Sequence, residues 1–121
     1  PNKEFTFDFE HVGSDSEKKY EGRFTVRTVL NVGQKHAMAL EHTRLLGNHP
    51  NPTEELSGFA RVLSNLRAKI IQSPEWWKQS NGGTLIEDED CLVALYIKVL
   101  EAEDQWREDL KKKTETLSNQ S

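Results

Sequence analysis

The spacing of apolar residues changes once along this chain, near Asn31, and the change limits the fold more than any other feature of the sequence. Apolar residues before Asn31 recur at every second position, and those after it recur at every third or fourth position. The first period is typical of half-buried strands and the second of amphipathic helices. The sequence therefore predicts an α+β fold, mostly helical, in which an N-terminal β-hairpin packs on about three main α-helices.

The hairpin is predicted from two alternating runs. Phe5, Phe7 and Phe9 alternate with polar residues, and a second alternating run covers residues 20–27. A polar loop at 13–19 separates the runs, as in a hairpin with a long connection. Because an isolated hairpin is only marginally stable in water, we expect its phenylalanine face to cover the helices.

The first two helices have recognisable start signals. The first is predicted from Val32 to Leu46, with Asn31 as its N-cap, Gln34 in the capping-box position and Gly47 after its last turn. The second is predicted to begin at Asn51-Pro52 and to end near residue 73. Its apolar stripe consists of Leu56, Phe59, Ala60, Leu63, Leu66, Ile70 and Ile71. Its basic flank consists of Arg61, Arg67 and Lys69. We expect this flank to pair with the acidic last helix, and the alternative, phosphate binding, is disfavoured because the whole chain is acidic.

The last helix is predicted to start at the acidic run 87–90 and to end about 25 residues later at the basic run 111–113, since both runs complement the helix dipole. Its main apolar stripe consists of Leu92, Leu95, Tyr96, Val99, Ala102, Trp106 and Leu110. A second stripe consists of Val93, Ile97 and Leu100. A helix in a two-layer domain needs only one apolar face. The second stripe is therefore expected to contact the hairpin or another subunit.

The sequence predicts a single domain over residues 1–121. We divide it into a hairpin region at 1–30, a helical region at 31–113 and a polar tail at 114–121, which we expect to be frayed. Only 35% of the residues are hydrophobic and 30% are charged. Part of the stability is therefore expected to come from a partner or from self-association.

Two adjacent tryptophans, Trp76 and Trp77, lie in the segment 73–77, ahead of the glycine pair at 82–83. Neighbouring side chains point in different directions, so one hydrophobic surface rarely buries both rings. We expect one ring in the core and the other at an interface, because Trp is enriched at interface hot spots. The predicted partner-binding residues are Trp76, Trp77, Val93, Ile97 and Leu100.

No catalytic constellation is evident, so we predict a protein that is not an enzyme and that uses no catalytic residues, cofactor or metal. The four histidines lack the spacing of a helical metal site. The acidic residues at 101–109 lack the Glu-x-x-His companion of a bundle metal site. Cys91, the only cysteine, excludes an intramolecular disulfide and fits a reducing compartment. Nearby carboxylates disfavour its thiolate, so we expect a buried, inert thiol.

The charge balance argues against direct binding of nucleic acid. The net charge is −4 and the pI is about 5.6, whereas a nucleic-acid backbone requires a basic footprint. No membrane contact is expected either, because the longest apolar run, at 91–97, is far shorter than the roughly 18 residues of a membrane span. The first residues, 1–4, contain no apolar signal segment.

Several short motifs occur in an order that resembles a known group of proteins. They are Tyr20-Glu21-Gly22-Arg23-Phe24-Thr25-Val26, a helix ending in Leu45-Leu46-Gly47, Ser73-Pro74-Glu75-Trp76-Trp77, Gly83-Thr84-Leu85, and a last helix with Tyr96 and Glu103. Across residues 20–106 the chain resembles small proteins encoded in the structural gene clusters of tailed bacteriophages. The resemblance implies a non-enzymatic structural or assembly role, in which helix surfaces bind other phage structural proteins.

Two roles within that group stay open. A tail assembly chaperone would act transiently in the host cytoplasm during assembly, whereas a minor virion component of the head or tail would remain in the virion. The alternative is an acidic regulatory protein, which would bind and block a host or phage nucleic-acid-binding protein with carboxylates that imitate phosphates.

The first testable prediction concerns metal ions, because the histidines and carboxylates lack the spacing of metal ligands. Adding EDTA is expected to leave the melting temperature of the protein unchanged, because no metal contributes to its folding free energy. Differential scanning fluorimetry with and without EDTA measures this. A fall in melting temperature that added metal reverses would contradict the prediction.

Overall fold

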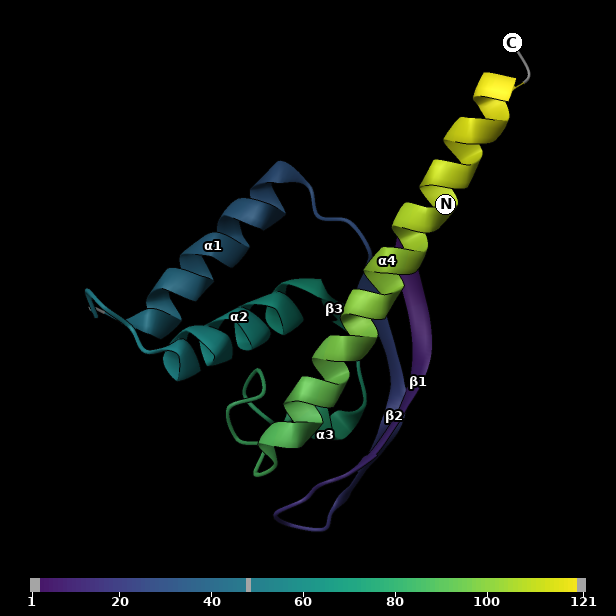
Figure 1. Ribbon diagram of the computed structural model, residues 1–121. Helices are drawn as coiled ribbons and strands as arrows, with labels where there is room; N and C mark the ends of the chain where they lie inside the picture. Colours follow the sequence, from purple (N-terminus) through teal and green to yellow (C-terminus); the bar gives the residue numbers. More distant parts are fainter. Residues whose placement is uncertain (1–2, 48, 120–121) are drawn as a thin grey trace.

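The computed structural model describes residues 3–47 and 49–119. These residues form one three-stranded sheet and four helices (Figure 1). In chain order they are β1 (Glu4–Val12), β2 (Lys19–Arg27), α1 (Val32–Leu46), α2 (Glu54–Lys69), β3 (Ile70–Gln72), α3 (Glu75–Lys78) and α4 (Glu89–Asn119). The prediction of a mostly helical α+β fold with an N-terminal hairpin is confirmed.

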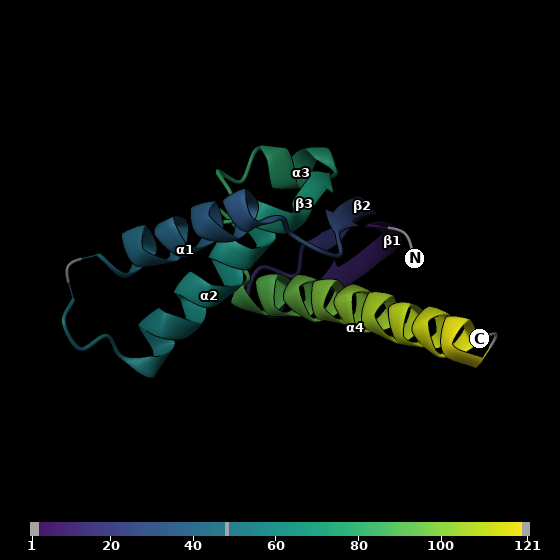
Figure 2. The same cartoon turned by 90° about the horizontal axis from the view of Figure 1, so that it is seen from above.

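The hairpin register places the phenylalanines on one face of the sheet. β1 pairs antiparallel with β2 so that Phe7 lies opposite Phe24 and Phe9 lies opposite Gly22. On the other face, Arg23 donates to Asp8 over 3.1 Å, as expected for oppositely charged cross-strand neighbours. Helix α4 runs along the hairpin (Figures 1 and 2), and the predicted covering of the phenylalanine face holds for the buried Phe9 and partly for Phe7, whereas Phe5 is 39% exposed.

A third strand, β3, was not predicted, because Ile70 and Ile71 continue the apolar spacing of the preceding helix. In the structure α2 ends at Lys69, and β3 pairs antiparallel with β2 through Ile70 and Val26. Two local preferences explain the change. β-Branched residues favour strands, and the residue before Pro74 is disfavoured in helical conformation. The correct end of the helix is therefore Lys69.

Helices α1 and α2 form an antiparallel pair (Figure 1). The predicted bounds of α1 are confirmed, with both bonds of the Asn31–Gln34 capping box present. The prediction that α2 begins at Asn51-Pro52 is wrong. Thr53 is the N-cap, since its hydroxyl oxygen accepts the backbone N–H of Leu56 over 3.1 Å.

Charged side chains tie α2 to both neighbouring helices. The carboxylate of Glu41 in α1 accepts from Arg44 and from Arg67 of α2. Arg44 first and then Arg67 lower the pKa of Glu41 to about 2, against the opposing effect of burial. Lys69 of α2 pairs with Glu103 of α4, and both side chains are largely buried. The expected pairing of the basic flank with the last helix thus holds for Lys69, whereas Arg67 pairs with α1.

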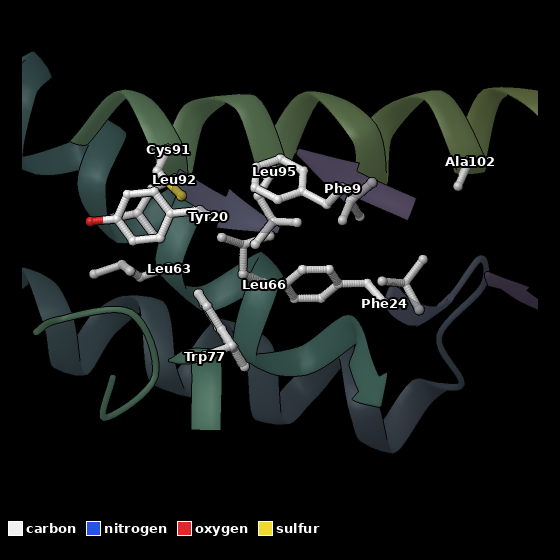
Figure 3. Close-up of a cluster of buried hydrophobic side chains, with 12 residues drawn as sticks. Phe9, Tyr20, Phe24, Leu63, Leu66, Trp77, Cys91, Leu92, Leu95 and Ala102 are labelled. Atoms are coloured by element: carbon white, nitrogen blue, oxygen red, sulfur yellow. The ribbon is translucent and has the colours of Figure 1, made fainter. Parts of the chain in front are cut away.

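The core lies where α4 crosses the hairpin, with α2 and α3 closing it from the opposite side (Figure 3). Its buried members are Phe9, Tyr20, Phe24, Val26, Leu63, Leu66, Trp77, Cys91, Leu92, Leu95, Val99 and Ala102. Phe59, which belongs to the same predicted stripe as Leu63, is only half-buried. It lies nearer the N-terminal end of α2.

Helix α4 continues well beyond the sheet (Figures 1 and 2). It runs through the lysines at 111–113, which were predicted to end it, and through the expected frayed tail as far as Asn119; residues 120–121 lie outside the described part. No Gly or Pro follows Gly83 in the sequence, so nothing interrupts the helix. Every described side chain from 107 to 117 is exposed.

The burial pattern of α4 generates a stability prediction. Leu95→Ala is expected to lower the free energy of unfolding by about 2–5 kcal/mol, because Leu95 is fully buried and its truncation leaves a cavity. Leu40→Ala is the matched control, since Leu40 is 59% exposed and the change should stay within about 0.5 kcal/mol. Urea unfolding of both variants measures the difference, and equal midpoints would contradict this packing.

Candidate protein-interaction surface

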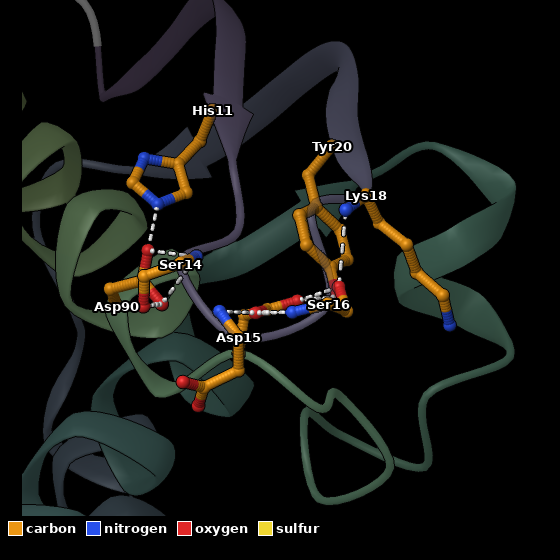
Figure 4. Close-up of polar contacts among 8 residues, drawn as sticks. His11, Ser14, Asp15, Ser16, Lys18, Tyr20 and Asp90 are labelled. Carbon is orange, nitrogen blue, oxygen red and sulfur yellow. Dashed lines mark hydrogen bonds and ion pairs between the residues drawn. The ribbon is translucent and has the colours of Figure 1, made fainter.

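The start of α4 is held by the loop between β1 and β2, which carries Ser14, Asp15 and Ser16 (Figure 4). The chief attachment is Asp88, just before the helix. The backbone N–H groups of Asp15 and Ser16 donate to Asp88 Oδ1 over 2.8 and 2.9 Å. Tyr20 donates its hydroxyl to Oδ2 over 2.6 Å, and the Ser16 hydroxyl donates to the same oxygen. A Cβ atom at Gly13 would lie 2.1 Å from Asp88 Cγ. The loop therefore closes this tightly only with glycine at that position.

Asp90, two residues further along the chain, makes a second attachment (Figure 4). Its Oδ2 lies 2.5 Å from His11 Nε2, and the Ser14 hydroxyl donates to its Oδ1 over 2.9 Å. Nearby, Lys18 pairs with Glu87 at 2.8 Å. The acidic run 87–90 was interpreted as a complement to the helix dipole. Three of its four carboxylates also bind the hairpin or its loop.

The pKa values of Asp88, Tyr20 and Cys91 are strongly shifted by these contacts and by burial. The hydroxyl groups of Ser16 and Tyr20 lower the pKa of Asp88 well below its usual range. Burial, and then the bond to Asp88, raises the pKa of Tyr20 to about 12. Burial raises the pKa of Cys91 to about 12, with Asp90 and Asp88 adding to the effect. The thiol is fully buried and protonated at neutral pH, as expected for an inert cysteine.

Both attachments fix the rotation of α4 about its own axis. Cys91, Leu92 and Leu95 point into the core, so the side chains of the second stripe point outward. Val93 is 43% exposed, Ile97 49% and Leu100 36%. We call these three residues the outward stripe. Neither the hairpin nor another described element covers it, and it remains an apolar surface on a regular helix.

Two hollows flank the outward stripe at Val93. The first, about 220 Å³, lies between α2 and α4 and is lined by Glu55, Gly58, Phe59, Val62, Glu89, Leu92 and Val93. The second, about 480 Å³, lies between α4 and the β1–β2 loop and is lined by Ser14, Asp15, Glu89, Asp90, Val93, Ala94 and Ile97. No pattern in the sequence indicated that α2 and the loop border this stripe. Phe59 belongs to the predicted apolar stripe of α2, but it is half-buried and lines the first hollow.

The two tryptophans do not form a common surface with the outward stripe. Trp77 is buried and points into the core (Figure 3). Trp76 lies on the sheet, with its ring centroid 5.1 Å from that of Tyr20, and its indole N–H donates to the carbonyl of Glu21 over 2.9 Å. Gly22 permits this approach, because a Cβ there would lie 2.6 Å from Pro74 Cβ. Neither tryptophan lines either hollow.

Within 3–47 and 49–119, no three His, Cys, Asp or Glu side chains come together in a way that could hold a metal ion. In the same residues, no helix is both long enough and apolar enough to cross a membrane.

Comparison with models of protein families, with curated proteins and with solved structures finds no match to this chain.

The attachment at Asp88 generates a prediction about stability and pH. Asp88→Asn is expected to lower the melting temperature at neutral pH by roughly 5–10 °C, because an amide nitrogen cannot accept the hydroxyl donors of Ser16 and Tyr20. The control is Asp8→Asn, whose side chain is 80% exposed and which should change little.

The same carboxylate should make folding sensitive to acid. The pKa of Asp88 is lower in the folded chain than in the unfolded chain, so its contribution is present above the unfolded value of about 3.8 and is lost as the pH falls further. Thermal melts of the wild type and Asp88→Asn between pH 7 and pH 2 measure this. The two melting temperatures should converge in acid, and a constant gap would contradict the assignment.

Proposed function

We propose that this chain is a non-enzymatic binding protein that docks on another protein through the outward stripe of α4. The observation that carries the proposal is the exposure of Val93, Ile97 and Leu100 on one face of a helix whose opposite face already fills the core. Contiguous apolar side chains on a surface mark interaction sites more often than isolated ones do. The rigid attachment of the helix start adds support, because a preorganised surface loses less entropy on binding.

The displaced pKa values also support a binding role over a catalytic one. Asp88, Tyr20 and Cys91 have strongly shifted pKa values, and such groups are candidates for catalysis when they line a cleft. Here Asp88 and Tyr20 bind each other, and Cys91 packs in the core. Each shift thus has a structural cause.

The resemblance to proteins from the structural gene clusters of tailed phages supplies the class of partner. We propose a structural or assembly protein that binds other virion proteins, either as a tail assembly chaperone or as a minor virion component. Both roles require a docking surface and no chemistry. Detection of the chain in purified particles would favour the virion component, and its absence from them would favour the chaperone.

One observation favours the acidic regulator as a second candidate. Beyond Leu100 the same side of α4 carries the exposed carboxylates of Glu101, Asp104 and Glu108, spaced three and four residues apart. A row of carboxylates on a helix can occupy the phosphate sites of a nucleic-acid-binding protein. Displacement of the captured partner by DNA would distinguish this candidate from the assembly protein.

Photo-crosslinking tests the proposed surface directly. A photoreactive amino acid in place of Ile97 is expected to give a discrete adduct in producing cells, because Ile97 lies at the centre of the outward stripe. The matched control places the same group at Leu40 of α1, which is also exposed. An adduct of twice the mass of the chain would identify self-association. No adduct at position 97, or equal adducts at both positions, would contradict the proposal.

A further inference from the structure

The hollows beside Val93 have rims of a single charge sign. The ionisable residues that line the first hollow are Glu55 and Glu89, and those of the second are Asp15, Glu89 and Asp90. Among the described residues that line the two hollows, none is Lys, Arg or His. The floors are apolar, with Phe59, Val62, Leu92 and Val93 in the first and Val93, Ala94 and Ile97 in the second.

Most of these rim carboxylates are available to a partner. Asp90 is already bound by His11 and Ser14. By contrast, the carboxylates of Glu55, Glu89 and Asp15 form no ion pair or side-chain hydrogen bond within the described part of the chain. Their negative potential is therefore not neutralised by the protein itself, and a cation arriving at the rim would meet no competing lysine or arginine among the lining residues.

A second copy of the chain would bring further carboxylates to this surface. In an antiparallel pair of α4 helices centred on Ile97, Asp104 of one copy would face Asp90 of the other, because these residues lie equally far from Ile97 on either side. A parallel pair would place each carboxylate beside its own counterpart. Like charges in such contact are destabilising and suppress the wrong partner.

We propose that the occupant is an amphipathic helix of another protein that carries Lys or Arg beside its apolar side chains. Its apolar side chains enter the two hollows on either side of Val93, and its cations pair with Glu55, Glu89 and Asp15. An amphipathic helix suits the site because it places apolar anchors on one face and cations along its edges. This inference rests on the proposed function and names the chemistry of the partner.

Two labelled model peptides test the proposal with the full chain. Each is about 18 residues long, or five helical turns. One combines Leu and Lys at helical spacing, and the other replaces every Lys with Glu. Fluorescence anisotropy is expected to show binding of the Lys peptide only, and high salt should weaken that binding because the rim charges are exposed.

Two variants locate the binding site. Glu55→Gln combined with Glu89→Gln should weaken binding of the Lys peptide roughly three- to tenfold, since two exposed ion pairs are lost. Val93→Ser should weaken binding about fivefold or more, because Val93 lines both hollows and the change removes its apolar side chain. Serine has nearly the same helix propensity as valine, so the helix itself should persist. The matched control, Asp109→Asn combined with Glu115→Gln, makes the same change in net charge on the projecting part of α4 and should have no effect.

Several outcomes would overturn the proposal. They are equal weakening by the control pair, tight binding of the Glu peptide, or binding of neither peptide. If the crosslink at Ile97 still forms in those cases, the proposed function stands and only the chemistry of the partner is wrong. Peptide binding without a crosslink would instead overturn the proposed function.

Discussion

The arrangement of the fold depends on the buried carboxylate of Asp88, which connects the start of α4 to the β1–β2 loop and to β2. Asp88 is fully buried, and an ionised carboxylate is stable in such a place only when donors surround it. Four donors from the β1–β2 loop and β2 meet that requirement. The chain between Ser16 and Asp88 contains strands β2 and β3 and helices α1, α2 and α3. One side chain therefore fixes where α4 starts relative to the hairpin.

This attachment also sets the rotation of α4 about its axis. It therefore determines which of the two apolar faces of the helix is buried and which is exposed. A helix with apolar residues on two sides could in principle bury either one. Asp88 and Asp90 reach the loop only when Leu92, Leu95 and Val99 face the sheet. The stripe that begins at Val93 is then left outside. Polar contacts thus decide which apolar residues form the core and which form a surface.

The parts of the fold that depend on local preferences could be predicted from the sequence, and those that depend on distant contacts could not. The hairpin and the capping box of α1 involve residues close together in the chain, and both are present. Strand β3 continues the apolar spacing of α2, so its β-branched residues and the nearby Pro74 were not enough to predict it without its pairing to β2. The outward stripe was recognisable as a second apolar face. Its hollows require Glu55 and Asp15, which lie far from α4 in the sequence.

Neighbouring carboxylates in the acidic run 87–90 have different roles, since some hold the fold together and another lies on the proposed binding surface. Asp88, just before α4, and Asp90, in its first turn, both bind the hairpin or its loop, while Glu89 between them stays exposed on the rim of both hollows. Neutralising Glu89 removes only an exposed charge near the helix dipole, a small contribution of about 0.3–1 kcal/mol. The rim could therefore change its charge, and with it the choice of partner, while Asp88 keeps the helix in place.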